Sequence, residues 1–199
     1  MPSIAAHMVM AKLVGEKLNI NCPEFIRGNL LPDVTLEEDS HHKIQGKIFK
    51  IPDADYFKDS LDLQDQSNLG YYVHLLLDKY FLEDFVPNNI SNLEVFRQRI
   101  MYREYDIVNY HLVRVFELDI PYLKSVLTSY EVPVKRNKLN ANLDFLSRKA
   151  TGETTYLNAQ TFEQFLQNVA PVIIEEVEKY ASEPKTLSIG TRKWKKWKH

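Results

Sequence analysis

The sequence predicts an all-α protein that folds as a single-domain helical bundle. Along most of the 199 residues, apolar side chains recur every three or four positions, which is the spacing of one helical face. Segments in which polar and apolar residues alternate are few, and the chain has only six glycines, so little of it favours a sheet. An apolar content of 44% is enough to fill a core at this length.

Two helices are predicted near the N-terminus. Residues 3–18 carry an amphipathic pattern, and Asn21-Cys22-Pro23 interrupts it. A short helix then follows and ends near Pro32, because proline disfavours a helical conformation in the residue before it. Residues 34–52 are acidic and then polar, and we expect a loop there with one short extended piece at residues 48–51.

The middle of the chain predicts three further helices. Pro52-Asp53 is a typical helix start, and the apolar pattern after it continues to about Leu63. The next helix has Ser67 or Asn68 as its cap and ends before Pro87. A long helix is expected to begin at Ser91 and to continue to about residue 115.

Two helices are predicted in the last third. One covers residues 121–130, and the basic, Asn-rich segment 135–142 after it favours a loop. The other covers about 158–181, where Pro171 should bend or split it. The spacing of three and four is clearest in this helix, at Phe162, Phe165, Leu166, Val169, Ile173, Val177 and Tyr180.

The charge is unevenly distributed. Residues 185–199 contain six Lys or Arg and no acidic residue, which leaves 19 basic and 27 acidic residues and a charge of −8 on residues 1–184. We therefore expect a helical metal-binding domain over 1–184 and a flexible basic tail over 185–199. Nucleic-acid binders usually carry a basic stripe on the folded body, so nucleic acid is not the expected partner of this one.

The basic tail ends in residues 191–199, where cations alternate with Trp194 and Trp197. This pattern favours peripheral contact with an anionic membrane, with Trp at the level of the lipid headgroups. Stacking on a single-stranded nucleic acid is an alternative. A solvated tail, or one that folds back on the acidic body, is a third interpretation and needs no partner.

A cytoplasmic protein is expected. Cys22 is the only cysteine, so an internal disulfide is impossible, and its place beside Pro23 favours an ordinary thiol over a nucleophile. The apolar runs are far shorter than the roughly 18–20 residues of a membrane span. The first residues lack the basic start and apolar run of a secretion signal.

Five positions in the first 78 residues carry side chains that bind metal ions. His74 and Asp78 are four residues apart in an apolar helical segment, so they share one face. Each costs about 1–3 kcal/mol if buried without a partner, and either a metal ion or a mutual hydrogen bond would satisfy both. His7, Asp33 and His41 complete the set. Such nitrogen and carboxylate ligands suit zinc, and also manganese or iron. A single histidine on an apolar face is more often an ordinary core residue, so the site is predicted from the set as a whole.

The order of these motifs resembles the zinc-dependent phospholipase C family, most of all its small bacterial members. The family has an N-terminal helical His, a Gly-x-x-x-Pro-Asp motif, a loop His and a Gly-x-x-x-His-x-x-x-Asp helix. Here His7 is followed by Gly28 to Asp33, then Ser40-His41, then Gly70 to Asp78. The resemblance covers roughly residues 1–80 and implies a helical fold of the phospholipase C and P1 nuclease type.

The resemblance also implies roles for single residues. Asp78 is placed to bridge to a second ion, and His42 replaces His41 if the loop register shifts by one. Asp33 gains a catalytic role as well, because a carboxylate beside the attacking water can orient it or accept its proton. Pro32 should hold Asp33 in an extended conformation. The implied metal ligands are His7, Asp33, His41, His74 and Asp78.

The chain also departs from the secreted members of the family, which bind three ions. It lacks their N-terminal tryptophan and their second histidine cluster, so one or two zinc ions are expected. Asp106 and His111, with Glu104, are candidates for a second site, and an ordinary solvated face is the alternative for these acids.

The expected function is therefore metal-dependent phosphoester hydrolysis by a metal-activated water. The substrate would be a phosphoester small molecule or a phospholipid head group. A non-enzymatic helical binding or scaffold protein, with a structural metal or none, is the alternative. A phosphohydrolase of the HD type is a third hypothesis, but it requires a His-Asp dipeptide that the chain lacks. No Gly-x-Ser-x-Gly turn or phosphate-binding Gly-rich loop is present.

Overall fold

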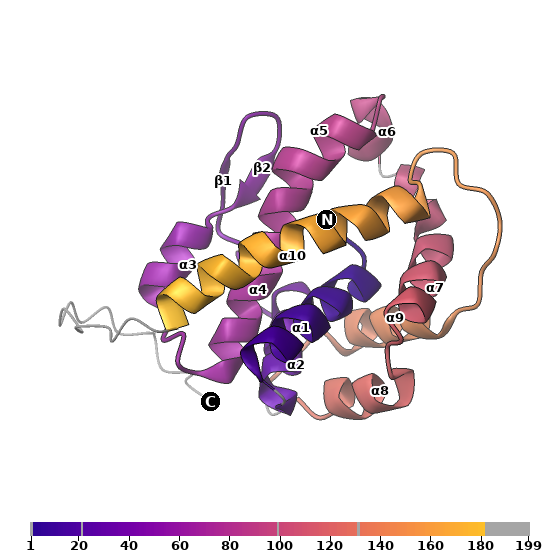
Figure 1. Ribbon diagram of the computed structural model, residues 1–199. Coiled ribbons are helices and arrows are strands. Elements are labelled where there is room, and N and C mark those ends of the chain that lie inside the picture. Colours follow the sequence, from indigo (N-terminus) through magenta and orange to yellow (C-terminus); the bar gives the residue numbers. More distant parts are fainter. Residues whose placement is uncertain (1, 21, 99, 131, 182–199) are drawn as a thin grey trace.

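The computed structural model describes residues 2–20, 22–98, 100–130 and 132–181. The described chain is mostly helical, which confirms the all-α prediction (Figure 1). The helices are α1 (Ile4–Leu18), α2 (Pro23–Val34), α3 (Ala54–Ser60), α4 (Gln66–Tyr80), α5 (Val86–Asn89), α6 (Leu93–Arg97), α7 (Tyr105–Val115), α8 (Ile120–Thr128), α9 (Arg136–Ser147) and α10 (Ala159–Ala181). A π-helical turn, η1 (Phe81–Phe85), joins α4 to α5, and a 3-10 turn, η2 (Ile100–Glu104), precedes α7.

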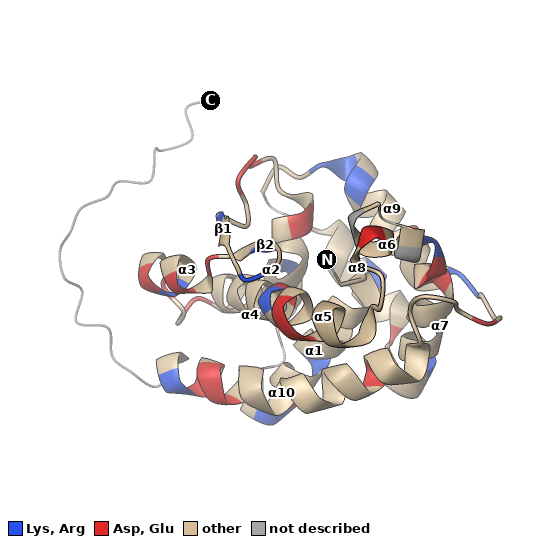
Figure 2. Cartoon of the chain, turned by 90° about the horizontal axis from the view of Figure 1, so that it is seen from above, with Lys and Arg blue, Asp and Glu red and all other residues tan. Residues whose placement is uncertain are grey.

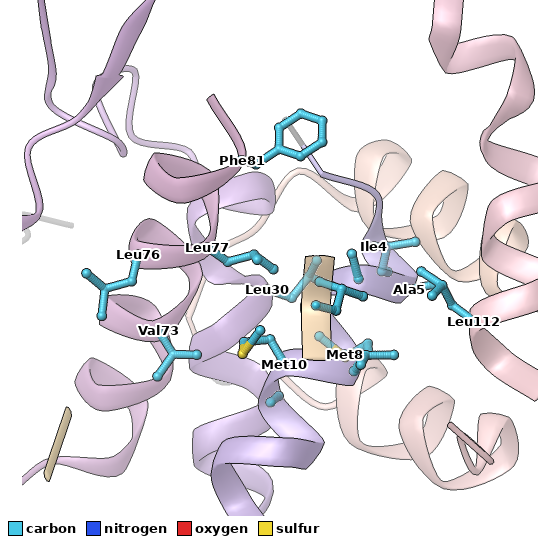
Figure 3. Packing of buried hydrophobic residues seen from close by; sticks show 14 of the residues in the cluster. Ile4, Ala5, Met8, Met10, Leu30, Val73, Leu76, Leu77, Phe81 and Leu112 are labelled. Carbon is cyan, nitrogen blue, oxygen red and sulfur yellow. The ribbon is translucent and has the colours of Figure 1, made fainter. Parts of the chain in front are cut away.

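Helix α1 lies at the centre of the molecule. It packs against α2, α4, α7, α9 and α10, and most of its residues are buried. Figure 3 shows side chains of α1 meeting Leu30 of α2, Leu77 of α4 and Leu112 of α7 in one apolar cluster. Because α1 is apolar on nearly all sides, it is suited to a position where neighbours cover it all round. His7 is therefore carried into the middle of the core.

Helices α2 and α4 pack closely because each has a glycine at the crossing. A Cβ atom on Gly28 would lie 2.0 Å from the carbonyl oxygen of Ser67, and one on Gly70 would lie 2.1 Å from that of Phe25. Neither position tolerates any side chain. This contact brings the C-terminal half of α4 against the last turns of α2, where Asp33 lies.

Helix α10 covers the α1 and α4 side of the bundle and runs across the front in Figure 1. The residues that the sequence predicts for its apolar face are buried from Phe162 to Val177, whereas Tyr180 is half-buried and Ala170 joins the buried face. Pro171 is exposed and the helix is not split there, because packing on both sides of the proline holds the backbone helical. None of the described helices combines the length and apolarity that a membrane crossing requires.

The structure confirms the predicted helices at both ends of the chain and corrects several in between. The short extended piece expected at 48–51 overlaps β2 (Lys50–Pro52), and the expected loop also contains β1 (Lys43–Gln45), which pairs with β2 in an antiparallel hairpin that sets Ile44 opposite Ile51. Helix α2 continues two residues beyond Pro32, so the expected extended conformation of Asp33 is wrong. A proline in the last turn removes one backbone donor, and the amide of Thr35 still bonds the carbonyl of Leu31 at 2.9 Å.

Three other boundaries also differ. Asp65, not Ser67 or Asn68, caps α4 by accepting the Asn68 amide at 3.0 Å. The expected helix from Ser91 to residue 115 is broken into α6, η2 and α7. The Asn-rich segment expected as loop belongs to α9, whose apolar face is formed by Leu139, Leu143 and Leu146.

The tail over 185–199, with its predicted membrane contact at 191–199, lies outside the described residues. Figure 2 shows acidic and basic residues interspersed along the described helices and loops.

Candidate metal centre

Three helices and one loop bring five candidate ligands to one place. His7 comes from the second turn of α1, and Asp33 from the last turn of α2. His41 lies in the loop between α2 and β1, and His74 and Asp78 lie one turn apart on α4. His7, His74 and Asp78 have ligand atoms within 4.8 Å of one another, as do Asp33, His41 and His74. The structure thus gathers residues that are up to 71 positions apart in the sequence.

Three of these residues form a tight triangle of ligand atoms. The Nε2 atom of His41 lies 3.2 Å from Oδ2 of Asp78. It lies 3.3 Å from Nε2 of His74, whose distance to the same Asp78 oxygen is 3.6 Å. Two ligand atoms of a tetrahedral zinc ion, each at about 2.0–2.1 Å from the metal, are about 3.3–3.4 Å apart. The triangle therefore has the dimensions of one face of such a tetrahedron.

His7 flanks this triangle on its buried side. Its ring stacks on that of His74, with centroids 3.8 Å apart and planes inclined by 8°. Its Nε2 atom lies 3.5 Å from the other Asp78 oxygen, Oδ1, which is longer than an ordinary hydrogen bond. The two oxygens of Asp78 thus face different histidines.

The outer hydrogen bonds of His41 and His74 fix which ring nitrogens carry protons. Nδ1 of His74 donates to the carbonyl oxygen of Asn29 at 2.7 Å, which leaves its Nε2 free to accept. The hydroxyl of Ser40 donates to the carbonyl of Pro32 at 2.8 Å, so it accepts from Nδ1 of His41 at 3.0 Å. In the neutral rings, both Nε2 lone pairs therefore point at each other and at a carboxylate. Three acceptors at this distance repel one another unless a cation or a proton lies among them.

Electrostatics within the cluster follow from burial and from the close contacts. Burial, and the nearby His74, lower the pKa of His7 to about 4, so its ring is neutral at pH 7. For His74, burial lowers the pKa, but Asp78 outweighs this and the net pKa is raised. Burial raises the pKa of Asp78, but the three histidines hold it well below its usual value. The pKa of Asp33 is also lowered, because the charges of His74 and His7 outweigh its burial.

A further observation indicates that these residues suit a metal ion. Both ring nitrogens of His7 and both oxygens of Asp78 are buried and have no hydrogen-bond partner among the described residues. Buried polar atoms are usually paired, since each unpaired one costs about 1–3 kcal/mol. A divalent cation bound by Asp78 would be a partner for its carboxylate.

The other predicted site residues lie elsewhere. His42 points away and stacks on Tyr56, with ring centroids 4.0 Å apart. Asp106 pairs with Arg148 at 3.2 Å, and His111 bonds Glu163 at 2.7 Å. The structure does not bring them together as a second site. Glu104, the third candidate for that second site, accepts hydrogen bonds from the backbone amides of Thr155, Tyr156 and Leu157.

Several residues around the cluster are not apparent from the sequence. Asn29 binds His74 through its backbone carbonyl, and its side-chain amide donates to the carbonyl of Gly70. Ser40 orients His41, and its own carbonyl accepts from the hydroxyl of Tyr71. Lys138 of α9 lies 3.5 Å from Asp33. Of these residues, Ser40 alone gives a sequence signal, because it is adjacent to His41. A backbone acceptor such as that of Asn29 leaves no pattern in the sequence, and neither does a contact between residues 105 positions apart, such as Lys138 and Asp33.

No protein-family model, no curated protein and no solved structure matches this chain. The inference on function therefore depends on the cluster itself and on the order of its motifs.

Proposed function

We propose that this chain is a metal-dependent phosphoester hydrolase of the zinc-dependent phospholipase C and P1 nuclease type. The observation that carries the proposal is the triangle formed by His41, His74 and Asp78, whose edges of 3.2, 3.3 and 3.6 Å match a tetrahedral zinc site. Phosphoesters are proposed as substrates because the motif order resembles that family.

One ion is the favoured number. His74 belongs to both groups of neighbouring ligand atoms, but only its Nε2 lone pair is free, because Nδ1 binds Asn29. One lone pair serves one ion, so two complete three-ligand sites would compete for it. His41, His74 and Asp78 would hold the ion, with Asp33 beside it on the solvent side. Zinc suits this nitrogen and oxygen set, and manganese or iron are the alternatives.

The partial exposure of the cluster on one side favours a catalytic site over a closed structural site. The side chains of His7, His74 and Asp78 are completely buried, whereas those of Asp33 and His41 are 14% and 10% exposed. Structural zinc sites are closed by four protein ligands, and catalytic sites keep one position open. Among the five candidate ligands, Asp33 and His41 are the two with exposed side-chain surface, so a substrate would approach on their side.

The chain's own residues would act as follows. When bound, the cation supplies Lewis-acid chemistry and lowers the pKa of a coordinated water. Asn29 and Ser40 keep His74 and His41 in the binding tautomer. Asp33 remains a carboxylate at neutral pH, because its pKa is lowered, so it would orient the attacking water by accepting a hydrogen bond and would be a weak base.

Metal content and hydrolysis test this proposal together. Protein purified without chelators should contain about one zinc or manganese per chain, and Asp78→Ala should remove it, because the variant loses the only ligand that faces all three histidines. Asp106→Ala is the matched control, since Asp106 lies outside the cluster and should leave the metal content unchanged. Hydrolysis of aryl phosphomonoesters and phosphodiesters should depend on the metal.

Two results would contradict the proposal in different ways. Folded protein that stays metal-free after zinc is added would exclude a metal centre. Stoichiometric metal with complete inactivity on both ester classes would favour the scaffold alternative, in which the ion is structural.

A further inference from the structure

A positively charged side chain, that of Lys138, lies on the solvent-facing side of the candidate metal centre. Lys138, on α9, places its Nζ atom 3.5 Å from Oδ1 of Asp33, and its side chain is 52% exposed. Asp33 is one of the two candidate ligands that reach solvent. Lys138 therefore lies where a substrate would enter, and it is free to move because half of its side chain is in water.

A second donor lies on the same face of α9. Asn142 is four residues after Lys138, so the two side chains are one helical turn apart. The Nδ2 atom of Asn142 is buried and has no hydrogen-bond partner within the described part of the chain. Helix α9 packs against both α1 and α2, which carry His7 and Asp33. Lys138 and Asn142 thus share one face of a helix that contacts the two helices carrying His7 and Asp33.

We propose that Lys138, with Asn142 as a second donor, binds the phosphoryl group of the substrate at the mouth of the metal centre. The inference rests on the proposed function, which it deepens. Without a metal, the charge of Asp33 holds Lys138. A cation bound beside Asp33 would compete with Lys138 for the carboxylate, so Lys138 would be released to pair with the phosphoryl group, which is negatively charged. Lys138 is thus a substrate-binding residue and not a metal ligand.

Binding of inorganic phosphate to the zinc-loaded protein tests this proposal without any turnover. Isothermal titration should show that Lys138→Gln weakens phosphate binding about tenfold, which corresponds to about 1.4 kcal/mol. Lys138→Arg should restore most of the affinity, because it keeps the positive charge. Asn142→Leu should weaken binding by about threefold to tenfold, as expected for one lost hydrogen bond. Lys135→Gln, an exposed change of the same charge at the start of α9, is the matched control and should have little effect.

Zinc content is measured on every variant, which separates the two proposals. Equal phosphate affinity of the wild type, Lys138→Gln and Lys135→Gln, with zinc bound in all, would overturn the role of Lys138 and leave the metal centre intact. Equal weakening by Lys138→Gln and Lys135→Gln would also overturn it, since it would show a general charge effect. Loss of zinc from Lys138→Gln would make Lys138 a structural residue of the centre and would contradict the inference as well. Absence of zinc from the wild type would contradict the proposed function itself.

Discussion

At the scale of single residues, the cluster depends on groups that are not themselves ligands. Ser40 and the carbonyl of Asn29 take the outer nitrogens of His41 and His74, and so direct the inner lone pairs at Asp78. Such outer partners fix the tautomer and the orientation of a ligating histidine. The proposed binding of zinc should therefore be sensitive to the hydroxyl of Ser40, which does not contact the ion site.

Replacement of Ser40 by alanine tests this dependence. Ser40→Ala should lower zinc affinity about tenfold to a hundredfold, because His41 loses the acceptor that holds its Nδ1 proton. Competition with a chromophoric chelator measures the affinity. Ser60→Ala, an exposed change at the end of α3, should leave it unaltered. Unchanged affinity in both variants would show that His41 is oriented by other contacts or is not a ligand.

At the scale of elements, the α2 and α4 pair is the frame of the site. Its two glycines allow backbone contact, and the same contact places Asn29 beside His74. The pattern of apolar residues predicts both helices but not how closely they approach. The glycines indicate a close approach, yet which atoms fill the space is known only from the structure.

Because α2 and α4 approach so closely, replacing Gly70 by alanine should lower the stability of the protein. Glycine to alanine inside a helix ordinarily stabilises by about 0.5–1 kcal/mol. Gly70→Ala should instead destabilise by about 2–4 kcal/mol, since its new Cβ would lie 2.1 Å from a backbone oxygen that cannot move freely. Urea unfolding measures the difference. Asn140→Ala, on the exposed face of α9, is the control and should change stability by less than about 0.5 kcal/mol. A neutral or stabilising Gly70→Ala would mean that the two helices are farther apart than described.

Elements that the sequence does not predict have identifiable physical causes. The break between α6 and α7 lies where Glu104 accepts amides from a distant loop, a tertiary contact that local propensity does not encode. Helix α9 was concealed by its Asn and Lys content, although Leu139, Leu143 and Leu146 carry the helical spacing. The polar composition favours a loop there, but the burial of these three leucines decides the conformation.

At the scale of the whole molecule, the notable feature is a charged and polar cluster inside an apolar bundle. The sequence predicts which five residues belong to it, because their order resembles a known family and because His74 and Asp78 share a helical face. It does not predict the geometry, since that depends on how α1, α2 and α4 cross. It also gives no sign of Lys138, which comes from a helix that the sequence does not predict.

Burial of the cluster makes the stability of the metal-free protein depend on pH. The pKa of His7 is lowered from 6.5 to about 4, so between these values the unfolded chain binds a proton that the folded chain does not. This contribution to stability is complete above pH 6.5 and is lost as the pH falls towards 4, by on the order of 3 kcal/mol. The lowered pKa of Asp78 acts in the same direction at still lower pH, and the raised pKa of His74 acts oppositely.

A comparison of two proteins isolates the part due to His7. Urea unfolding of chelator-treated wild type and His7→Gln at pH 7 and pH 4.5 should show a larger loss of stability in the wild type. The absolute stability of the variant does not matter, because the test is the difference between the two pH values. Equal losses would indicate that the ring of His7 is solvated and not enclosed in the core.

The candidate ligands and Lys138 come from different parts of the sequence, which affects how the two could vary among related proteins. Every candidate donor of the centre lies between residues 7 and 78, whereas the cation at its mouth belongs to a helix far along the chain. Mutations that alter which molecules are admitted need not disturb the centre. Under the proposed role of Lys138, relatives that differ at position 138 would differ in the substrates they bind, while the residues of the centre stay the same.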